Sequence, residues 1–162
     1  MTLERPSMRG RHSAGLLLFR RRDGALEVFL VHPGGPYWAR RNEGAWSIPK
    51  GEYVPDEEDA LAAARREVRE ETGFCPPGPF VPLAACRQAG GKWISAWAVE
   101  APELEPAQLR SNTFTLEWPP RSGVQREFPE VDRGAWFGLA EAQSRLIGGQ
   151  RALLRELAAA MK

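Results

Sequence analysis

The sequence predicts an α/β sandwich, in which helices cover both faces of a mixed β-sheet. Two observations predict this fold class. Short β-prone runs are interleaved with two or three helical runs along the 162 residues, as expected of a sheet packed between helices. Some connections between strands are hairpin turns, so the strand directions should be mixed. The length suits a single domain with one sizeable core.

In the first part of the chain the sequence predicts two strands in a hairpin, a loop and a short third strand. Asp23-Gly24 separates two apolar, β-prone runs and is a strong signal for a two-residue turn. Pro49 and Gly51 should stop the third strand. A flexible polar segment is expected over 1–12, followed by a single folded domain over 13–162. The expected elements are strands over 13–22 and 25–33, a loop over 33–44 and a strand over 45–51.

The central helix is predicted over 58–72. Asp56 or a neighbouring acid is suited to cap its N-terminus, and Gly73 lies just past its end, where glycine commonly terminates a helix. Apolar residues recur at helical spacing on one side and should pack on the sheet. They are Ala60, Leu61, Ala64 and Val68.

After this helix the sequence predicts a strand pair and two C-terminal helices. Gly90-Gly91 should turn the strand pair. The segment 101–130 is irregular by composition, although 113–118 could form a strand. The expected elements are strands over 80–88 and 92–100, the end of a strand over 133–139, and helices near 138–147 and 150–160.

Composition and charge are ordinary for a soluble globular protein, with 43% apolar and 27% charged residues. A net charge of +1 gives no support to a nucleic-acid or acidic-membrane partner. The apolar run 14–19 is too short to span a bilayer, and no signal peptide is evident. Cys75 and Cys86 are too few for a disulfide framework or a zinc site. We therefore expect a cytoplasmic monomer or homodimer.

Three carboxylates gather on a second face of the central helix. Glu67, Glu70 and Glu71 are spaced i, i+3 and i+4, so they project from one side. Two unit charges ~4 Å apart repel by roughly 4 kcal/mol at an effective dielectric of ~20. A divalent cation removes that conflict, and magnesium favours hard oxygen ligands. The alternative is an ordinary solvated helix, with Arg66 paired to Glu70 and Arg65 free in solvent.

The wider pattern resembles the Nudix box, G-x5-E-x7-R-E-U-x-E-E-x-G-U, where U is a bulky aliphatic residue. Glu58 is followed by seven residues and then by the run 66–74, Arg-Glu-Val-Arg-Glu-Glu-Thr-Gly-Phe. The resemblance implies an α/β/α sandwich and a hydrolase that depends on Mg²⁺ or Mn²⁺. The spacing from Gly51 to Glu58 is one residue longer than in the standard box. Either Gly51 is displaced, or Glu57 takes part of the role of Glu58.

The resemblance also implies roles for the residues of the box. The metal ligands would be Gly51, through its backbone carbonyl, Glu67, Glu70 and Glu71. Glu58 would be a supporting residue. The catalytic set would be Glu67, Glu70, Arg66 and Glu130. Glu67 would be either a ligand or the base that activates water, and Arg66 would hold a carboxylate in position. Glu130 lies six residues before Trp136, an offset at which several Nudix enzymes carry a candidate base, and Glu127 is the reserve candidate.

Substrate contacts are expected from basic and aromatic residues in loops. Lys50, Arg40 and Arg41 could bind phosphates, and Tyr37 and Trp38 could stack on a base. The irregular loop 117–123 carries Trp118 and Arg121 and could close over the substrate. For each set the alternative is a solvated charge or a packing aromatic. His12 and His32 have no partner at ligand spacing, so they are expected to be exposed or locally bonded.

Three functions remain open. The first is metal-dependent hydrolysis of a nucleoside diphosphate linked to another group. A dinucleoside polyphosphate is favoured because "IPKG" at 48–51 is similar to the entry of that Nudix subgroup, and a nucleoside triphosphate is close behind. The second is a non-catalytic nucleotide-binding regulator. The third is an isomerase of isoprenoid diphosphates, which would need a cysteine in the cleft.

Overall fold

The protein is described by a computed structural model over residues 11–88 and 91–162. Its strands are β1 (His12–Arg22), β2 (Ala25–Pro33), β3 (Lys50–Tyr53), β4 (Val81–Pro82), β5 (Cys86–Arg87), β6 (Trp93–Glu100), β7 (Thr113–Glu117), β8 (Gln125–Pro129) and β9 (Val131–Gly138). Its α-helices are α1 (Ala60–Thr72), α2 (Leu139–Arg145) and α3 (Ala152–Ala160), with short 3-10 turns at Pro106–Gln108 and Gly148–Gln150.

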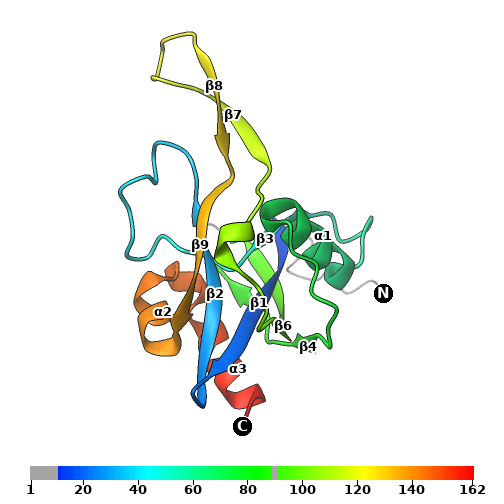
Figure 1. Ribbon diagram of the computed structural model, residues 1–162. Coiled ribbons are helices and arrows are strands. Elements are labelled where there is room, and N and C mark those ends of the chain that lie inside the picture. The colour runs from blue at the N-terminus through cyan, green and yellow to red at the C-terminus, as the bar shows by residue number, and fades with distance from the viewer. Residues whose placement is uncertain (1–10, 89–90) are drawn as a thin grey trace.

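The centre of the molecule is a mixed seven-stranded sheet (Figure 1). Its main path runs β4-β6-β1-β2-β9, while β3 pairs with β1 and β5 pairs with β6. β1 and β6 are parallel, from His12 opposite Trp93 to Phe19 opposite Glu100, and the other pairs are antiparallel. The predicted α/β sandwich with a mixed sheet is therefore confirmed.

β1 is buried on both faces because helices lie on either side of it. Successive side chains of a strand point to opposite faces. Leu16 and Leu18 share one apolar cluster with Val68 of α1, whereas Leu17 shares the other with Leu157 of α3. Figure 1 shows α1 on one side of the sheet and α2 with α3 on the other. This burial explains why β1 reads as a continuous apolar run and not as an alternating one.

The ends of α1 follow the expected helix chemistry. Its N-cap is Asp59, whose carboxylate accepts a hydrogen bond from the Ala62 amide at 3.1 Å, and not Asp56. Asp59 takes this position because the loop turns between Val54 and Glu58 before the helix begins. Gly73 ends the helix in the left-handed region, at φ 83°.

The strand predicted over 45–51 is wrong in its position. The residues around Trp46 and Ser47 form only isolated bridges, and β3 runs from Lys50 to Tyr53 along β1. Pro49 separates the two parts because it has no amide hydrogen to donate; its carbonyl instead accepts from Leu16. Gly51 therefore lies inside β3, although it was expected to end the third strand.

Two other boundaries differ from expectation. The strand predicted over 80–88 is broken into β4 and β5, which both pair with β6, and Pro82 cannot donate to the ladder. The turn predicted at Gly90-Gly91 lies partly outside the described residues. So does the flexible segment predicted over 1–12, of which His12 already belongs to β1. In the described part of the chain, no helix has the length and apolar character needed to cross a membrane.

β7 and β8 form a separate two-stranded hairpin, which extends away from the sandwich (Figure 1). β7 confirms the strand that was possible at 113–118. β8 was missed, because its sequence Gln-Arg-Glu-Phe-Pro is polar and exposed. The predicted loop 117–123 is the turn of this hairpin. At its other end, the chain passes from β8 through Glu130 into β9.

Candidate active site

α1 brings its carboxylates to the start of β3. Its buried residues, Ala63, Ala64 and Val68, pack against the sheet, which leaves the acidic face beside β3. The backbone amide of Lys50 donates to the Glu71 carboxylate at 3.2 Å. Beside it, a Cβ atom added to Gly51 would overlap the carboxylate of Glu67. Because Gly51 has no side chain, the backbone of β3 and the acids of α1 can approach each other closely.

The extra residue between Gly51 and Glu58 is taken up in a local turn. The amides of Glu57 and Glu58 both donate to the carbonyl of Val54, at 2.9 and 3.1 Å. Gly51 remains beside the acids, and Glu58 contacts Arg66. Neither displacement of Gly51 nor replacement of Glu58 by Glu57 is seen among the described residues.

Arg66 is the counter-ion of the acidic face. Its guanidinium makes two hydrogen bonds of 2.8 Å to the two carboxylate oxygens of Glu58. Its Nη1 also donates to Glu67 at 2.8 Å and to Glu70 at 3.2 Å. The hydrogen bond from Arg66 lowers the pKa of Glu58, and the pairing with Glu58 raises the pKa of Arg66. The ion pair between Arg66 and Glu70, expected of an ordinary helix, is therefore present, although it belongs to a larger network.

Glu71 is the most strongly perturbed acid of the site. Burial raises its pKa to about 8, and the nearby Glu130 and Glu67 act in the same direction, while Lys50 opposes them. Burial also raises the pKa of Glu67 and lowers the pKa of Lys50. Several acids thus converge where water is limited, and the positive charges of Lys50 and Arg66 do not fully offset the effect of burial on their pKa values.

Glu71 opens into a cavity of about 170 Å³, whose lining also includes Lys50, Glu130 and Trp38. Glu130 is fixed there by its backbone: its amide donates to Asn112 at 2.8 Å, and its carbonyl accepts from Gly34 at 2.9 Å. The chain therefore brings Glu130 to the box acids from the junction of β8 and β9.

The reserve candidate, Glu127, lies elsewhere. It is exposed on β8, where it pairs across the hairpin with Thr115. It is not part of the cavity lining. The cysteines are also outside this lining: Cys75 follows α1 and Cys86 lies on β5.

The predicted substrate residues divide into three groups. Lys50 and Trp38 line the cavity, and the Arg41 guanidinium lies 5.4 Å from the centre of the Trp38 ring. Tyr37 packs edge-on against Trp118 of the hairpin, with ring centres 5.3 Å apart. Arg40 is exposed and Arg121 lies in the hairpin turn at φ 63°; in the described structure neither lines the cavity.

The buried His32 and the more exposed Asp132 form a link that the sequence did not indicate. His32 was expected to be exposed or locally bonded, but it is fully buried: its Nδ1 is 3.0 Å from the Asp132 carboxylate, and its Nε2 is 2.6 Å from the carbonyl of Arg41. The link ties the loop that carries Trp38 to the start of β9. Its partners are 100 and 9 residues away along the chain, so no local spacing could reveal it.

The oxygen donors of the site fit a divalent cation in their chemistry. Carboxylates are hard ligands of the type that Mg²⁺ and Mn²⁺ prefer, and burial is the main cause of the raised pKa of Glu71. In the described residues, no group of three acids, histidines or cysteines is already arranged around a metal position. Arg66 donates hydrogen bonds to both Glu67 and Glu70. A cation would therefore compete with Arg66 for their oxygens.

The NUDIX domain family model matches residues 10–157. The chain belongs to the Nudix family. The match covers all the elements of the sandwich, including α1, β9 and most of α3. The resemblance of residues 51–74 to the Nudix box is therefore confirmed, and the family match extends over residues 10–157.

Solved Nudix structures share this fold at low sequence identity. An Ap4A hydrolase from C. elegans, in a binary complex, is 21% identical with a TM-score of 0.63, over 93% of this chain and 97% of that one. The NUDIX domain of NrtR from Shewanella oneidensis, complexed with ADP ribose, is 17% identical with a TM-score of 0.61, over 94% and 89%. The Nudix hydrolase RenU from M. smegmatis is 25% identical with a TM-score of 0.55, over 94% and 89%. No curated protein matches the chain significantly.

Proposed function

We propose that this Nudix protein hydrolyses a phosphoanhydride bond in a nucleoside diphosphate linked to another group. A dinucleoside polyphosphate is the favoured substrate, followed by a nucleoside triphosphate. The observation that carries the proposal is the cavity in which Lys50, Glu71 and Glu130 meet beside the acids of α1. Family membership supports a nucleotide pyrophosphohydrolase type of function.

In this proposal Glu67, Glu70, Glu71 and the backbone of Gly51 would hold a divalent cation. When bound, the cation neutralises phosphate oxygens and lowers the pKa of water. Arg66 positions Glu67 and is itself held by its two hydrogen bonds to Glu58. Lys50 binds a phosphate oxygen, and Glu130 takes the proton of the attacking water, an effect typically worth ~10² to 10⁴ in rate.

The nucleoside would lie outside the cavity. A volume of about 170 Å³ is below the range of roughly 300–1,000 Å³ that drug-sized ligands occupy, so it suits a phosphate group better than a whole nucleotide. Tyr37 and Trp118, which already contact each other, provide aromatic surface for a base, and Arg41 lies beside Trp38 of the cavity wall. Aromatic stacking and guanidinium–phosphate contacts are both suited to nucleotides.

The test is a substrate screen with magnesium and manganese, with products identified by mass. Dinucleoside polyphosphates, nucleoside triphosphates, nucleotide sugars and inositol pyrophosphates should be compared. We expect turnover of at least one nucleotide class, and loss of at least ~10²-fold in Glu70→Gln and Glu71→Gln. The control is Glu156→Gln, on the exposed face of α3, which should retain full activity. Turnover in both site variants within about threefold of wild type would contradict the proposed ligand roles.

The alternative is a Nudix-fold regulator that binds a nucleotide without hydrolysing it. The observation that favours it is the occupation of Glu67 and Glu70 by Arg66. Equilibrium binding of unhydrolysed nucleotide in the presence of magnesium, with intact ligand recovered by mass, distinguishes this role from catalysis.

A further inference from the structure

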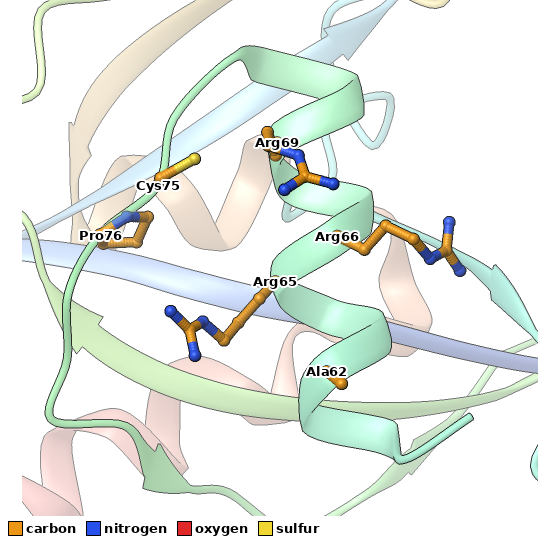
Figure 2. Close-up of a pocket in the computed structure, with 6 residues that line it drawn as sticks. All are labelled: Ala62, Arg65, Arg66, Arg69, Cys75 and Pro76. Atoms are coloured by element: carbon orange, nitrogen blue, oxygen red, sulfur yellow. The ribbon is translucent and has the colours of Figure 1, made fainter.

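α1 carries a second charged face, opposite in sign to the first. Arg65 and Arg69 are spaced i, i+4 and are attached about 160° and 200° around the helix from Glu67, on the side opposite to the acidic face. They line a cavity of about 250 Å³ together with Ala62, Arg66, Cys75 and Pro76. Figure 2 shows Arg65 extending from α1 toward the segment that carries Cys75 and Pro76, whereas Arg66 points away from that segment.

Among the described residues, the charges of Arg65 and Arg69 in this cavity have no acidic partner, unlike that of Arg66. Arg66 is neutralised by Glu58, Glu67 and Glu70. Among the ion pairs formed by the described residues, none includes Arg65 or Arg69. Arg65 instead lies 5.1 Å from the centre of the Phe80 ring, a contact that leaves its charge in place. Like charges at i, i+4 destabilise a helix, so an anion bound in the cavity that both residues line would reduce their repulsion.

We propose that this cavity is an anion site for the phosphate group of a small molecule, with Arg65 and Arg69 as its ligands. Guanidinium groups present paired N–H donors that match the oxygens of phosphate. The walls formed by Ala62 and Pro76 would contact the apolar part of a phosphate ester. The site is separate from the acidic face of α1, so it does not depend on the proposed hydrolysis.

Cys75 supplies a reporter inside the cavity. Its thiol is free and exposed at the cavity wall, whereas Cys86 is free on β5, outside it. Both thiols can be alkylated by negatively charged iodoacetate or by neutral iodoacetamide. The ratio of the two rates at one thiol measures the charge around it, because thiol reactivity is common to both reactions. Peptide mapping by mass separates the two cysteines.

The experiment compares wild type with the double variant Arg65→Gln/Arg69→Gln in EDTA, so that no cation recruits phosphate to the acidic face. Each guanidinium should favour iodoacetate by about threefold at ~6 Å in water. We therefore expect the ratio at Cys75 to fall by about tenfold in the double variant. Inorganic pyrophosphate at millimolar concentration should lower the wild-type ratio toward the value of the variant, and Cys86 should not respond.

The matched control is Arg155→Gln, an exposed arginine on α3, which should preserve both the ratio and its response to pyrophosphate. Arginine and glutamine have similar helix propensities, and circular dichroism checks that each variant is folded. The proposal is overturned if pyrophosphate does not change the wild-type ratio, or if it acts equally on the double variant. Turnover should be unaffected in the double variant. The alkylation ratio does not depend on turnover, so the test of the anion site remains valid even if the protein has no hydrolase activity.

Discussion

Gly51 and the carboxylate of Glu67 are in such close contact that strand β3 has no room for a side chain at this position. Glu67 is at the same time held by Arg66 at 2.8 Å. A methyl group at Gly51 can be accommodated only if the carboxylate leaves this position. The contact therefore couples the backbone of β3 to the acidic face of α1.

Gly51→Ala should reduce turnover strongly while reducing stability only modestly. The displaced group is the end of a flexible side chain, so we expect a loss of about 1–2 kcal/mol in unfolding free energy and of at least ~10-fold in kcat. Steady-state kinetics and denaturant unfolding check the two effects. In Gly148→Ala, where an added Cβ meets nothing within 4 Å, both should stay near wild type. Wild-type kcat in Gly51→Ala would show that Glu67 need not occupy its present position.

Divalent-cation binding should release a proton from Glu71 near neutral pH. Burial raises the pKa of Glu71 to about 8, so the metal-free folded protein retains this proton at pH 7. The stability contributed by the protonated form is present below the unfolded pKa and is lost as pH rises through about 8. A cation must displace the proton, so affinity should rise with pH until about 8.

Calorimetry with Mn²⁺ in buffers of different ionisation enthalpy measures this release. At pH 7 we expect up to about one proton per site, and close to none well above pH 8. Glu71→Gln should release none at either pH. Release from the variant equal to that of wild type would assign the proton to another group.

Glu130→Gln should lose ~10² to 10⁴ in kcat if Glu130 accepts the proton of water. KM should change little, because glutamine preserves the size of the side chain in the cavity. Glu127→Gln is the matched control on the same segment, since Glu127 is exposed on β8. Equal losses in both variants would indicate an effect of net charge and would remove Glu130 as the base.

His32→Leu should destabilise the protein by about 1–3 kcal/mol, because the carbonyl of Arg41 and the carboxylate of Asp132 would lose a buried partner. Loosening of the loop that carries Trp38 should also raise KM more than it lowers kcat. Urea unfolding and steady-state kinetics measure the two effects. Wild-type stability would show that the link contributes nothing to the fold.

The local signals in the sequence predicted local structure well. The hairpin at Asp23-Gly24 and the end of α1 at Gly73 depend on turn and cap chemistry, which acts over a few residues. The acidic face of α1 follows from helical spacing alone. The position of β3 could not be predicted in the same way, because it is set by pairing with β1 and not by the residues around Pro49.

Contacts between residues that are far apart in the sequence could not be predicted from local signals. Glu130 was selected by its spacing in a family pattern, and the cavity places it near Glu71. The pair His32–Asp132 has no such pattern, so it was found only in the fold. Glu58 was the expected supporting residue, but the extra residue after Gly51 allowed Glu57 to take part of its role; in the structure Arg66 meets Glu58, which follows the turn at Val54.

The hairpin of β7 and β8 has its own ladder and, within the part of the chain that the structure describes, no strand partner in the central sheet. Its side chains meet the rest of the protein near Tyr37 and Gly35, in the loop beside the cavity. Changes in its length or sequence can therefore alter the surface presented to a ligand while the two apolar clusters keep their packing. In this architecture, substrate preference can diversify by mutation of an appendage without loss of the folded scaffold.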